Sequence, residues 1–488
     1  MTHDIAVHSP HQRAEESSGR RHARRSGASP LKRLTLVATV GALAITGLSA
    51  VAAPAAHATE VNTVVAEISA GPAARAVAVT PDGSRIYVAN GDNGTVSVFD
   101  AATNLVIGNP ISVGDSPWAI AIAPIANRAY VANYGSGTVS VIDTSSDTLI
   151  HTIQVGVEPG AVAITPEGDQ VYVVNMNRGD DLSDAARGSV SVIDTATNTV
   201  ATTIPVGFWP SDIAITGTRA YVTNNHSNSI SIIDTSTESV TSSFNATAPG
   251  VIAITPDGSR GYFAENSFAG STIAMFSTAT NSVVGPSITV GTWPAGIGIT
   301  PDSNRAYVAN YASTYVSVVD TNPTSGTYNS QTATIDVDFL ESGDVAINAS
   351  GTYAYVSHIG SGKVSVIYLG TPPGAPTGVS AVAGPGSATV SWTAPASEGD
   401  PAISGYTATS SPGGFTCASA NAAARSCVVS GLTGGTEYTF TVTATSSGGT
   451  SAASSASSSV TPSAPAPAPA PQPTATPTPV SYTHLRAH

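Results

Sequence analysis

Short runs in which apolar and polar residues alternate follow one another through most of the chain, and turn residues separate them. The first complete set predicts strands at residues 76–80, 85–89, 95–100 and 105–113, with Pro81-Asp82-Gly83-Ser84 as the first turn. Alternation with a period of two is typical of β-strands and not of helices. The pattern therefore predicts an all-β protein assembled from units of four strands.

This four-strand unit recurs about every 42 residues, and one tyrosine in its second strand marks the register. Small residues fill the first strand of each unit, as at 161–164 and 296–299, which suits strands that converge on a common axis. Such a period, with several short strands per unit, is typical of β-propeller blades. Seven units predict a seven-bladed β-propeller over residues 59–370. The marker tyrosines are Tyr87, Tyr130, Tyr172, Tyr221, Tyr262, Tyr307 and Tyr355.

The seventh unit lacks its fourth strand, because the chain passes from residues 363–368 directly into Gly370-Thr371-Pro372-Pro373. An extra strand at 62–68 precedes the first unit instead, and its sequence matches the fourth strand of the third unit at 198–204. We therefore predict that the N-terminal strand completes the last blade. This pairing would join the two ends of the propeller and leave no open edge.

The second strand of each unit carries a short motif. It reads Tyr221-Val222-Thr223-Asn224 in the fourth unit, and Tyr-Val-Ala-Asn begins at Tyr87, Tyr130 and Tyr307. Over residues 61–369 the repeats resemble the YVTN family of β-propellers, which occurs in exported bacterial proteins and archaeal surface-layer proteins. The resemblance is weaker in the fifth unit, where Ser277 replaces an aspartate, and in the seventh, where His358 replaces the asparagine.

Residues 371–462 form a different unit of the usual size of a fibronectin type III domain. Trp392 suits the core tryptophan of an early strand, and Tyr438 suits the tyrosine corner of a late one. The segment therefore resembles a fibronectin type III domain, a module that commonly acts as a spacer or weak binder in exported bacterial proteins. Cys417 and Cys427 lie close together within it, and we expect them to form a disulfide in an oxidising compartment.

The first 58 residues have the features of a signal peptide: a basic region, an apolar stretch at 34–50 and the small-residue cleavage site Ala56-His57-Ala58. We predict cleavage and a secreted, extracellular protein, associated with the cell wall in one reading. The alternative is a retained anchor, although 17 interrupted residues are marginal for a span. Residues 463–479 are a Pro/Ala-rich linker. Residues 480–488 resemble a translated sequencing adaptor and are expected to be an artefact.

The predicted mature chain is strongly acidic. Between residues 59 and 479 it has ten Lys and Arg against 29 Asp and Glu, a net charge of −19, and Lys363 is the single lysine. Such a surface repels phosphate backbones and anionic lipid, so we expect no nucleic-acid partner and no docking on anionic membranes. Cleavage of the signal peptide would also leave no integral membrane span.

Candidate catalytic and metal-binding residues are few. His151 is predicted to face outward, whereas His226 and His358 follow second strands and are expected to be solvated. Asp180, Asp181 and Asp184 lie in an insertion of the third unit and are a weak calcium candidate, with an ordinary solvated loop as the alternative. An aspartate that ends the third strand is expected to accept backbone N–H groups in the next turn, which is a structural role. These aspartates are Asp100, Asp143, Asp194, Asp234 and Asp320.

Aromatic residues gather in loops that should open on one face of the propeller. We predict that the three tryptophans lie just before innermost strands, next to the loops after second strands, where asparagines such as Asn133 and Asn224 would join them. Such a rim could stack on sugars or bind a protein; alternatively, each tryptophan fills the seam between two blades. The candidate ligand-binding residues are Trp118, Trp209, Trp293, Phe208, Tyr134, Tyr311, His226, His358, Arg75 and Arg178.

Two classes of function fit this architecture. The first is a non-catalytic surface protein, expected to be a monomer without a cofactor, that binds a protein or an extracellular glycan. The second is an enzyme, since seven-bladed lactonases and quinoprotein dehydrogenase subunits have a similar architecture, or an accessory region of a larger glycan-degrading enzyme. The sequence has no Cys-x-x-Cys-His motif, and most propeller arginines occupy one repeated position. Fold alone does not decide function. We expect binding, because these residues do not suggest a clustered catalytic site.

Overall fold

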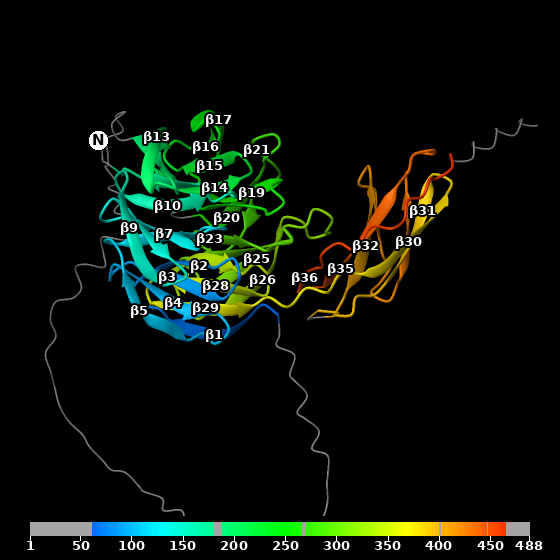
Figure 1. The fold of residues 1–488 in the computed structure, drawn as a ribbon, viewed down its shortest axis with the longest axis horizontal. Coiled ribbons are helices and arrows are strands. Elements are labelled where there is room, and N and C mark those ends of the chain that lie inside the picture. The colour runs from blue at the N-terminus through cyan, green and yellow to red at the C-terminus, as the bar shows by residue number, and fades with distance from the viewer. Residues whose placement is uncertain (1–60, 179–186, 266–269, 400–401, 447, 465–488) are drawn as a thin grey trace, which may run out of the picture. The chain divides into compact units, whose positions relative to one another are not determined.

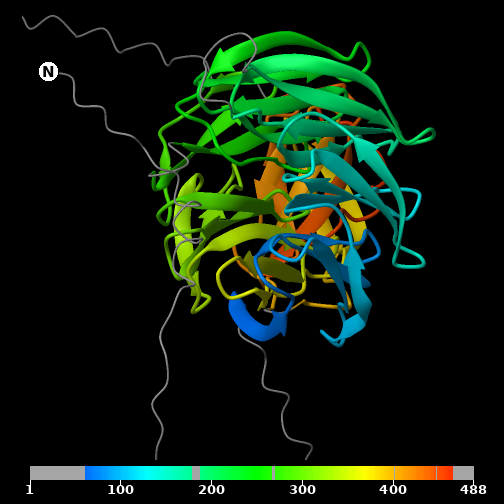
Figure 2. The same ribbon diagram turned by 90° about the vertical axis from the view of Figure 1, so that its left-hand side faces the viewer.

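The computed structural model describes residues 61–178, 187–265, 270–399, 402–446 and 448–464. The regular structure of these residues is entirely β, and none of them belongs to a helix that could cross a membrane. Seven antiparallel sheets of about 45 residues each are arranged as propeller blades (Figures 1 and 2). A separate sandwich of two sheets follows. The predicted all-β architecture, a seven-bladed propeller followed by a fibronectin type III fold, is confirmed.

In each blade the first strand lies innermost and the others follow outward in chain order, except in the seventh. The first three blades consist of β2 (Ala74–Val79), β3 (Arg85–Asn90), β4 (Thr95–Asp100) and β5 (Val106–Ser112); β6 (Pro117–Ile122), β7 (Arg128–Asn133), β8 (Thr138–Asp143) and β9 (Thr148–Gln154); and β10 (Pro159–Ile164), β11 (Gln170–Asn175), β12 (Arg187–Asp194) and β13 (Thr199–Phe208).

The outer strand of the fifth blade is split into two short pieces that pair with the same neighbour. Blades four to six consist of β14 (Pro210–Thr216), β15 (Arg219–Asn224), β16 (Ser229–Asp234) and β17 (Ser239–Asn245); β18 (Ile252–Ile254), β19 (Arg260–Glu265), β20 (Thr272–Ser277), β21 (Ser282–Val283) and β22 (Ile288–Thr289); and β23 (Pro294–Ile299), β24 (Arg305–Asn310), β25 (Tyr315–Asp320) and β26 (Ser330–Asp336).

The seventh blade joins the two ends of the propeller. It has the order β1 (Thr63–Ser69), β29 (Lys363–Tyr368), β28 (Tyr353–His358) and β27 (Ser342–Ile347), and Figure 1 shows β1 beside β29. Val64 pairs with Ile367 and Ile68 with Val364, as the sequence predicted. The segment before β1 contributes more than a strand, because the Tyr307 hydroxyl donates to Asn62 Oδ1 at 2.7 Å and so ties blade six to blade seven.

The asparagine of the repeated motif is a structural residue and not part of an exposed rim. Asn224 is fully buried, and its amide donates to Ser231 Oγ at 2.9 Å on the next strand while its Oδ1 accepts from Gly207 N–H at 3.0 Å. Because Asn224 is buried and bonded to Ser231 of its own blade and to Gly207 at the end of the preceding blade, the expectation that these asparagines line the rim was wrong. The same amide-to-serine bond of 2.9–3.1 Å recurs from Asn90, Asn133, Asn175 and Asn310.

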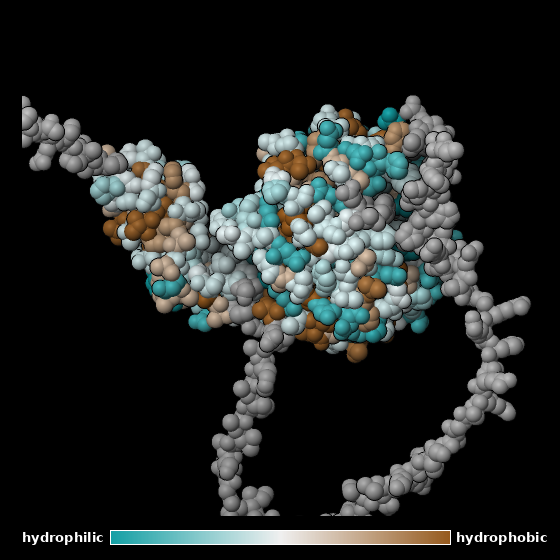
Figure 3. Space-filling view, turned by 180° about the vertical axis from the view of Figure 1, so that it is seen from behind, coloured by the Kyte–Doolittle hydropathy of each residue, from teal (hydrophilic) through white to brown (hydrophobic). Residues whose placement is uncertain are grey.

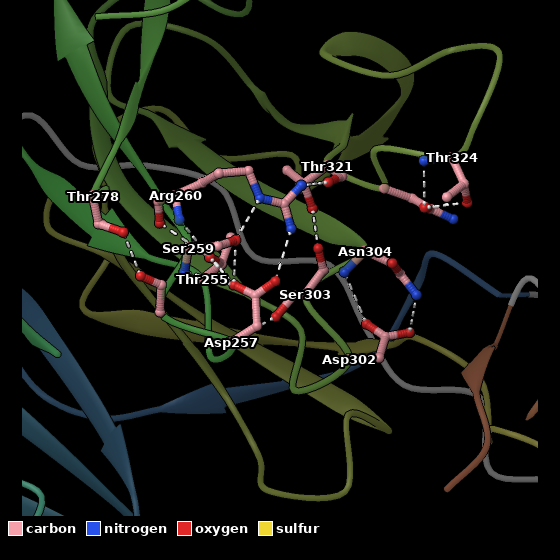
Figure 4. Close-up of polar contacts among 12 residues, drawn as sticks. Thr255, Asp257, Ser259, Arg260, Thr278, Asp302, Ser303, Asn304, Thr321 and Thr324 are labelled. Atoms are coloured by element: carbon pink, nitrogen blue, oxygen red, sulfur yellow. Dashed lines mark hydrogen bonds and ion pairs between the residues drawn. The ribbon is translucent and has the colours of Figure 1, made fainter. Parts of the chain in front are cut away.

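The repeated arginines hold neighbouring blades together. Arg260 on the second strand of blade five donates to the Thr321 carbonyl in a turn of blade six at 2.5 Å and pairs with Asp257 at 3.1 Å (Figure 4). Equivalent bonds to the next blade run from Arg85 to Thr144, from Arg128 to Thr195 and from Arg219 to Thr278. The position predicted to be framework is therefore a contact between blades.

The aspartates that end the third strands have the structural role expected of them. Asp100 Oδ1 accepts from the N–H groups of Ala102 and Thr103 at 3.1 and 2.8 Å, and these bonds, after the Thr103 hydroxyl, lower the pKa of Asp100. The same turn recurs at Asp143, Asp194, Asp234 and Asp320. These carboxylates are therefore committed to the fold.

A glycine at the end of the outer strand makes room for the buried asparagine. A Cβ on Gly156 would lie 2.5 Å from Asn175 Cγ, and the Asn175 amide is held by bonds to two serines of β12, Ser189 and Ser191. We therefore expect Gly156→Ala to lower the free energy of unfolding by about 1–3 kcal/mol, as overpacking does. Thermal unfolding would measure this against Gly326→Ala, where an added Cβ meets no atom within 4 Å. Equal stability of the two variants would contradict the clash.

The second fold consists of sheets β30-β31-β34 and β33-β32-β35-β36. Trp392 and Tyr438 are buried in its core, and the Tyr438 hydroxyl accepts from Thr433 N–H at 3.1 Å, which forms the predicted tyrosine corner. Cys417 and Cys427 form the predicted disulfide. The strands are β30 (Thr377–Gly384), β31 (Ser387–Thr393), β32 (Gly405–Ser411), β33 (Thr416–Ala418), β34 (Ser426–Ser430), β35 (Thr439–Ser446) and β36 (Gly449–Thr450).

Apolar residues on the face seen in Figure 3 lie in small groups among hydrophilic ones. Exposed aliphatic side chains such as Leu105 (67%) and Ile125 (62%) are ordinary for a protein surface when they are scattered.

Candidate binding site on the loop face

Two kinds of connection share one face of the propeller, which we call the loop face. One leads from each outer strand to the next innermost strand, and the other joins the second and third strands of a blade. They are tied together in nearly every blade, for example by Tyr134 N–H donating to the Ser116 carbonyl at 2.9 Å and Tyr311 N–H donating to the Trp293 carbonyl at 2.7 Å. The sequence therefore placed both loop types correctly on one face.

In the six blades for which this bond is described, its carbonyl belongs to a residue with a left-handed backbone, and Ala248 occupies the same place in the sequence of blade five. Seven residues occupy this position with φ between 38° and 63°, in order from blade one to blade seven: Ala73, Ser116, Glu158, Trp209, Ala248, Trp293 and Glu341. Such a conformation is uncommon for residues other than glycine. We call it the left-handed position of the blade.

A network of charged and aromatic side chains crosses the loop face from blade seven to blade two. The Arg75 guanidinium lies 4.2 Å from the centre of the Trp118 ring, and Trp118 lies 4.6 Å from the ring of Tyr134. Burial lowers the pKa of Arg75, while the negative charges of Asp92 and Glu341 act against this. Arg75 is thus held between an aromatic ring and carboxylates, and its Nε has no hydrogen-bond partner.

The network continues in both directions. Glu158 Oε2 accepts from the backbone N–H of Arg178 at 2.8 Å. Burial raises the pKa of Tyr134 to about 12, against the charge of Arg178, which lowers it, and together with that of Glu158. On the other side, burial and the carboxylate of Glu341 raise the pKa of Tyr311. Arg75, Arg178, Tyr134 and Tyr311 therefore belong to one group of interacting side chains.

Two further aromatic pairs lie at left-handed positions. The Trp209 ring is 4.3 Å from the exposed His226 ring in blade four, and the Trp293 ring is 4.4 Å from Tyr311 in blade six. Both tryptophans are half-buried. Phe208 instead contacts Arg187 at 5.0 Å. Trp118 differs from the prediction, because it lies inside the innermost strand β6 and not before it.

His358 is not the solvated loop residue that the sequence suggested. It is fully buried at the end of β28, where it takes the place of the motif asparagine: its Nε2 lies 2.8 Å from Ser365 Oγ and its Nδ1 lies 3.1 Å from Ser342 Oγ. A buried imidazole bonded to hydroxyls on both sides cannot contact a ligand on the loop face. His151, by contrast, is exposed on β9 as predicted.

This burial makes stability depend on pH. Burial lowers the pKa of His358 to about 4, against an ordinary value of 6.5. The charge of Glu67 raises this pKa, and that of Lys363 lowers it. Between these values the unfolded chain binds a proton that the folded chain excludes. The free energy of unfolding should therefore fall as the pH drops from about 6.5 to 4, by about 1.4 kcal/mol per pH unit at most.

We expect His358→Asn, which restores the motif residue, to remove this dependence. The variant should match the wild type near pH 8 and exceed it in stability at pH 5, as urea unfolding midpoints would show. Asp212, whose pKa burial raises to about 7, acts in the opposite direction but is present in both proteins. Parallel stability profiles for the two proteins would refute this assignment.

Two carboxylates on the innermost strands were missed by sequence reasoning. Asp212 Oδ2 accepts from Ile252 N–H at 2.8 Å in the next blade, and Asp344 Oδ2 accepts from Val77 N–H at 3.2 Å. Burial raises the pKa of both, and the charge of Asp344 adds to the shift at Asp212. The available signal was an aspartate at a position where the other blades have Ala, Gly or Val. Their bonds give them a role in joining blades.

The remaining candidate sites do not add to the loop face. Asp180, Asp181 and Asp184 lie outside the described residues. Within the described residues, no three His, Cys, Asp or Glu side chains are placed to hold a metal. A cavity of about 340 Å³ lies between blades one and two and is lined partly by Arg85 and Thr144, which form the contact between these blades.

The fold and loop face define a seven-bladed β-propeller with a following fibronectin type III domain. Residues 374–461 match the family model of the fibronectin type III domain, and residues 48–158 match that of the lactonase seven-bladed β-propeller. The chain is also similar to a solved structure of hydrazine synthase from Kuenenia stuttgartiensis, with a TM-score of 0.54 and 20% identity over 61% of this chain and 96% of that one. At this identity the likeness concerns the fold alone. A search of curated proteins found no match.

Proposed function

We propose that this chain is an exported, non-catalytic protein that binds a protein or glycan outside the cell through the loop face of a YVTN-type propeller. The observation that carries the proposal is the group of half-buried aromatic rings and paired charges that six blades contribute to this one face. Tryptophan, tyrosine and arginine are the residues most often responsible for binding energy at recognition surfaces.

The proposed location outside the cell is supported by two features. The first 58 residues have the composition of a signal peptide. Cys417 and Cys427 form a disulfide, and disulfides persist mainly in oxidising compartments. A fibronectin type III domain after the propeller would then act as a spacer.

A lactonase-type hydrolase is the second candidate, because residues 48–158 match the model of that propeller family. In this case the loop face would hold the substrate, and the charged groups Arg75, Glu158 and Glu341 would be the residues to test. The match covers the first two blades and β1, so it supports the fold more strongly than the reaction.

One set of measurements separates these candidates. The purified protein and an Arg75→Ala/Tyr134→Ala variant would be tested for binding to a glycan array and to an extracellular protein fraction, and for hydrolysis of small lactones. We expect binding that the double variant loses, without lactone turnover. Turnover by the wild type that the same variant loses would replace the binding proposal with the enzymatic one.

A further inference from the structure

The left-handed positions of five consecutive blades have a symmetric pattern. From blade three to blade seven they are occupied by Glu158, Trp209, Ala248, Trp293 and Glu341. Two tryptophans thus flank a small residue, and two carboxylates flank the tryptophans. We call these residues the Glu-Trp arc. The side-chain pattern is not imposed by the backbone, because Ala73, Ser116 and Ala248 adopt the same conformation in other blades.

The tryptophans of this arc are unfavourable for the backbone. Trp209 has φ = 49° and Trp293 has φ = 59°, where a bulky side chain is strained and glycine is not. Strained conformations of this kind are common at functional sites. Neither ring is needed to fill the core, because both are half-buried at the surface.

Each ring is held in place by a neighbouring ring from the loop after the second strand. Trp209 lies against His226 and Trp293 against Tyr311, with ring centres 4.3 and 4.4 Å apart. Preorganised aromatic rings bind at a low cost in conformational entropy. The arc therefore presents two fixed aromatic surfaces on either side of Ala248.

The carboxylates retain capacity to accept hydrogen bonds. Glu158 accepts from Arg178 N–H, and Glu341 interacts with Tyr311 and Arg75. An ionised carboxylate has about four lone-pair sites, so each can accept further donors. Because Arg75 and Arg178 balance the two glutamates, the arc has little net charge of its own.

We infer that the Glu-Trp arc binds an uncharged oligosaccharide, with sugar rings stacked on Trp209 and Trp293 and hydroxyl groups donating to Glu158 and Glu341. This inference rests on the proposed function and narrows its ligand. A pyranose ring has a flat apolar face for an indole and hydroxyl donors at its edge for a carboxylate. A polyproline segment fits indoles equally well, but its prolines have no N–H to donate. An anionic glycan would be repelled by a chain whose residues 59–479 have a net charge of −19.

Tryptophan fluorescence offers a direct test, because three of the four tryptophans lie on the loop face and Trp392 is buried in the second domain. The whole purified protein would be titrated with cellohexaose, xylohexaose, mannohexaose and N-acetylchitohexaose. We expect at least one to change the emission, with a Kd that changes less than threefold between 50 and 500 mM salt. Polygalacturonate, a chitosan oligomer and an alternating Ala-Pro peptide would serve as charged and peptide comparisons.

The decisive variants are Trp209→Gly and Trp293→Gly. Glycine suits the left-handed backbone, so neither variant should melt at a lower temperature than the wild type, while each should weaken oligosaccharide binding at least tenfold. Leu105→Ala, which removes an exposed apolar side chain on the opposite end of blade one, is the matched control and should bind normally.

Three results would overturn the inference: no binding of any neutral oligosaccharide, binding that both glycine variants retain, or binding restricted to the charged or proline-rich probes. If the Arg75→Ala/Tyr134→Ala variant nevertheless loses binding to an extracellular protein, the proposed function stands and only the saccharide assignment fails. Lactone turnover that depends on the loop face would instead refute both.

Discussion

A chain that begins at residue 70 is expected to be less stable than one that begins at residue 59 by at least about 5 kcal/mol. The shorter chain loses the buried side chain of Ile68, the packing of Val64 and Ala66, and the backbone bonds between β1 and β29. It also exposes the edge of β29, which is a site for aggregation. Thermal unfolding and light scattering of the two proteins would measure both effects.

Two further measurements keep this prediction testable if the shorter chain fails to fold. A peptide of residues 59–69 added during refolding should restore a soluble propeller. In the complete chain, Ile68→Ala should cost about 2–4 kcal/mol, whereas Val65→Ala, at a 42% exposed position on the same strand, should cost less than about 0.5 kcal/mol. Equal costs would show that β1 does not close the ring in solution.

Asn224→Leu is expected to lower the free energy of unfolding by about 2–4 kcal/mol, although leucine has a similar size. The substitution leaves the Gly207 N–H, on the preceding blade, and the Ser231 hydroxyl without their buried partner. A buried polar group without a partner costs about 1–3 kcal/mol, and two such groups are created here.

Asn245→Leu is the matched control for this measurement, because Asn245 is exposed at the end of β17 in the same blade. It should change stability by less than about 0.5 kcal/mol. Urea unfolding of the three proteins, with the slope of the transition compared as well, gives the difference. An Asn224→Leu variant as stable as the wild type would mean that the motif asparagine has a role other than stabilising the fold.

The propeller could be predicted from the sequence because its signals are repeated. Seven tyrosines in register set the number of blades, and the missing last strand with its early counterpart at 62–68 set the way the ring closes. A single strand would have been ambiguous, but an error in one unit is corrected by the other six. The split outer strand of blade five, at Ser282–Val283 and Ile288–Thr289, was not predicted because no other unit contains it.

The loop face was predicted less completely. Topology placed Trp209, Trp293 and Tyr311 on one face, but it could not distinguish Asn224, which points into the blade, from residues that point out. His358 was misjudged for the same reason, since a register one residue further would have exposed it. Glu158 and Glu341 lie at left-handed positions of the backbone. No residue type marks this conformation in the sequence, since Ala, Ser, Glu and Trp all adopt it here. The role of Asp212 and Asp344 comes from hydrogen bonds to the next blade, and the sequence pattern of a single blade does not reveal such bonds.

The closure of the last blade also bears on how the chain folds. Glu67 on β1 and Lys363 on β29 form an ion pair at 2.6 Å although 296 residues separate them. During synthesis β1 therefore remains without its partner strand until six complete blades have been made. Contacts of such long range are slow to form, so the last step of folding, and not the assembly of any single blade, should limit the rate at which the native protein appears.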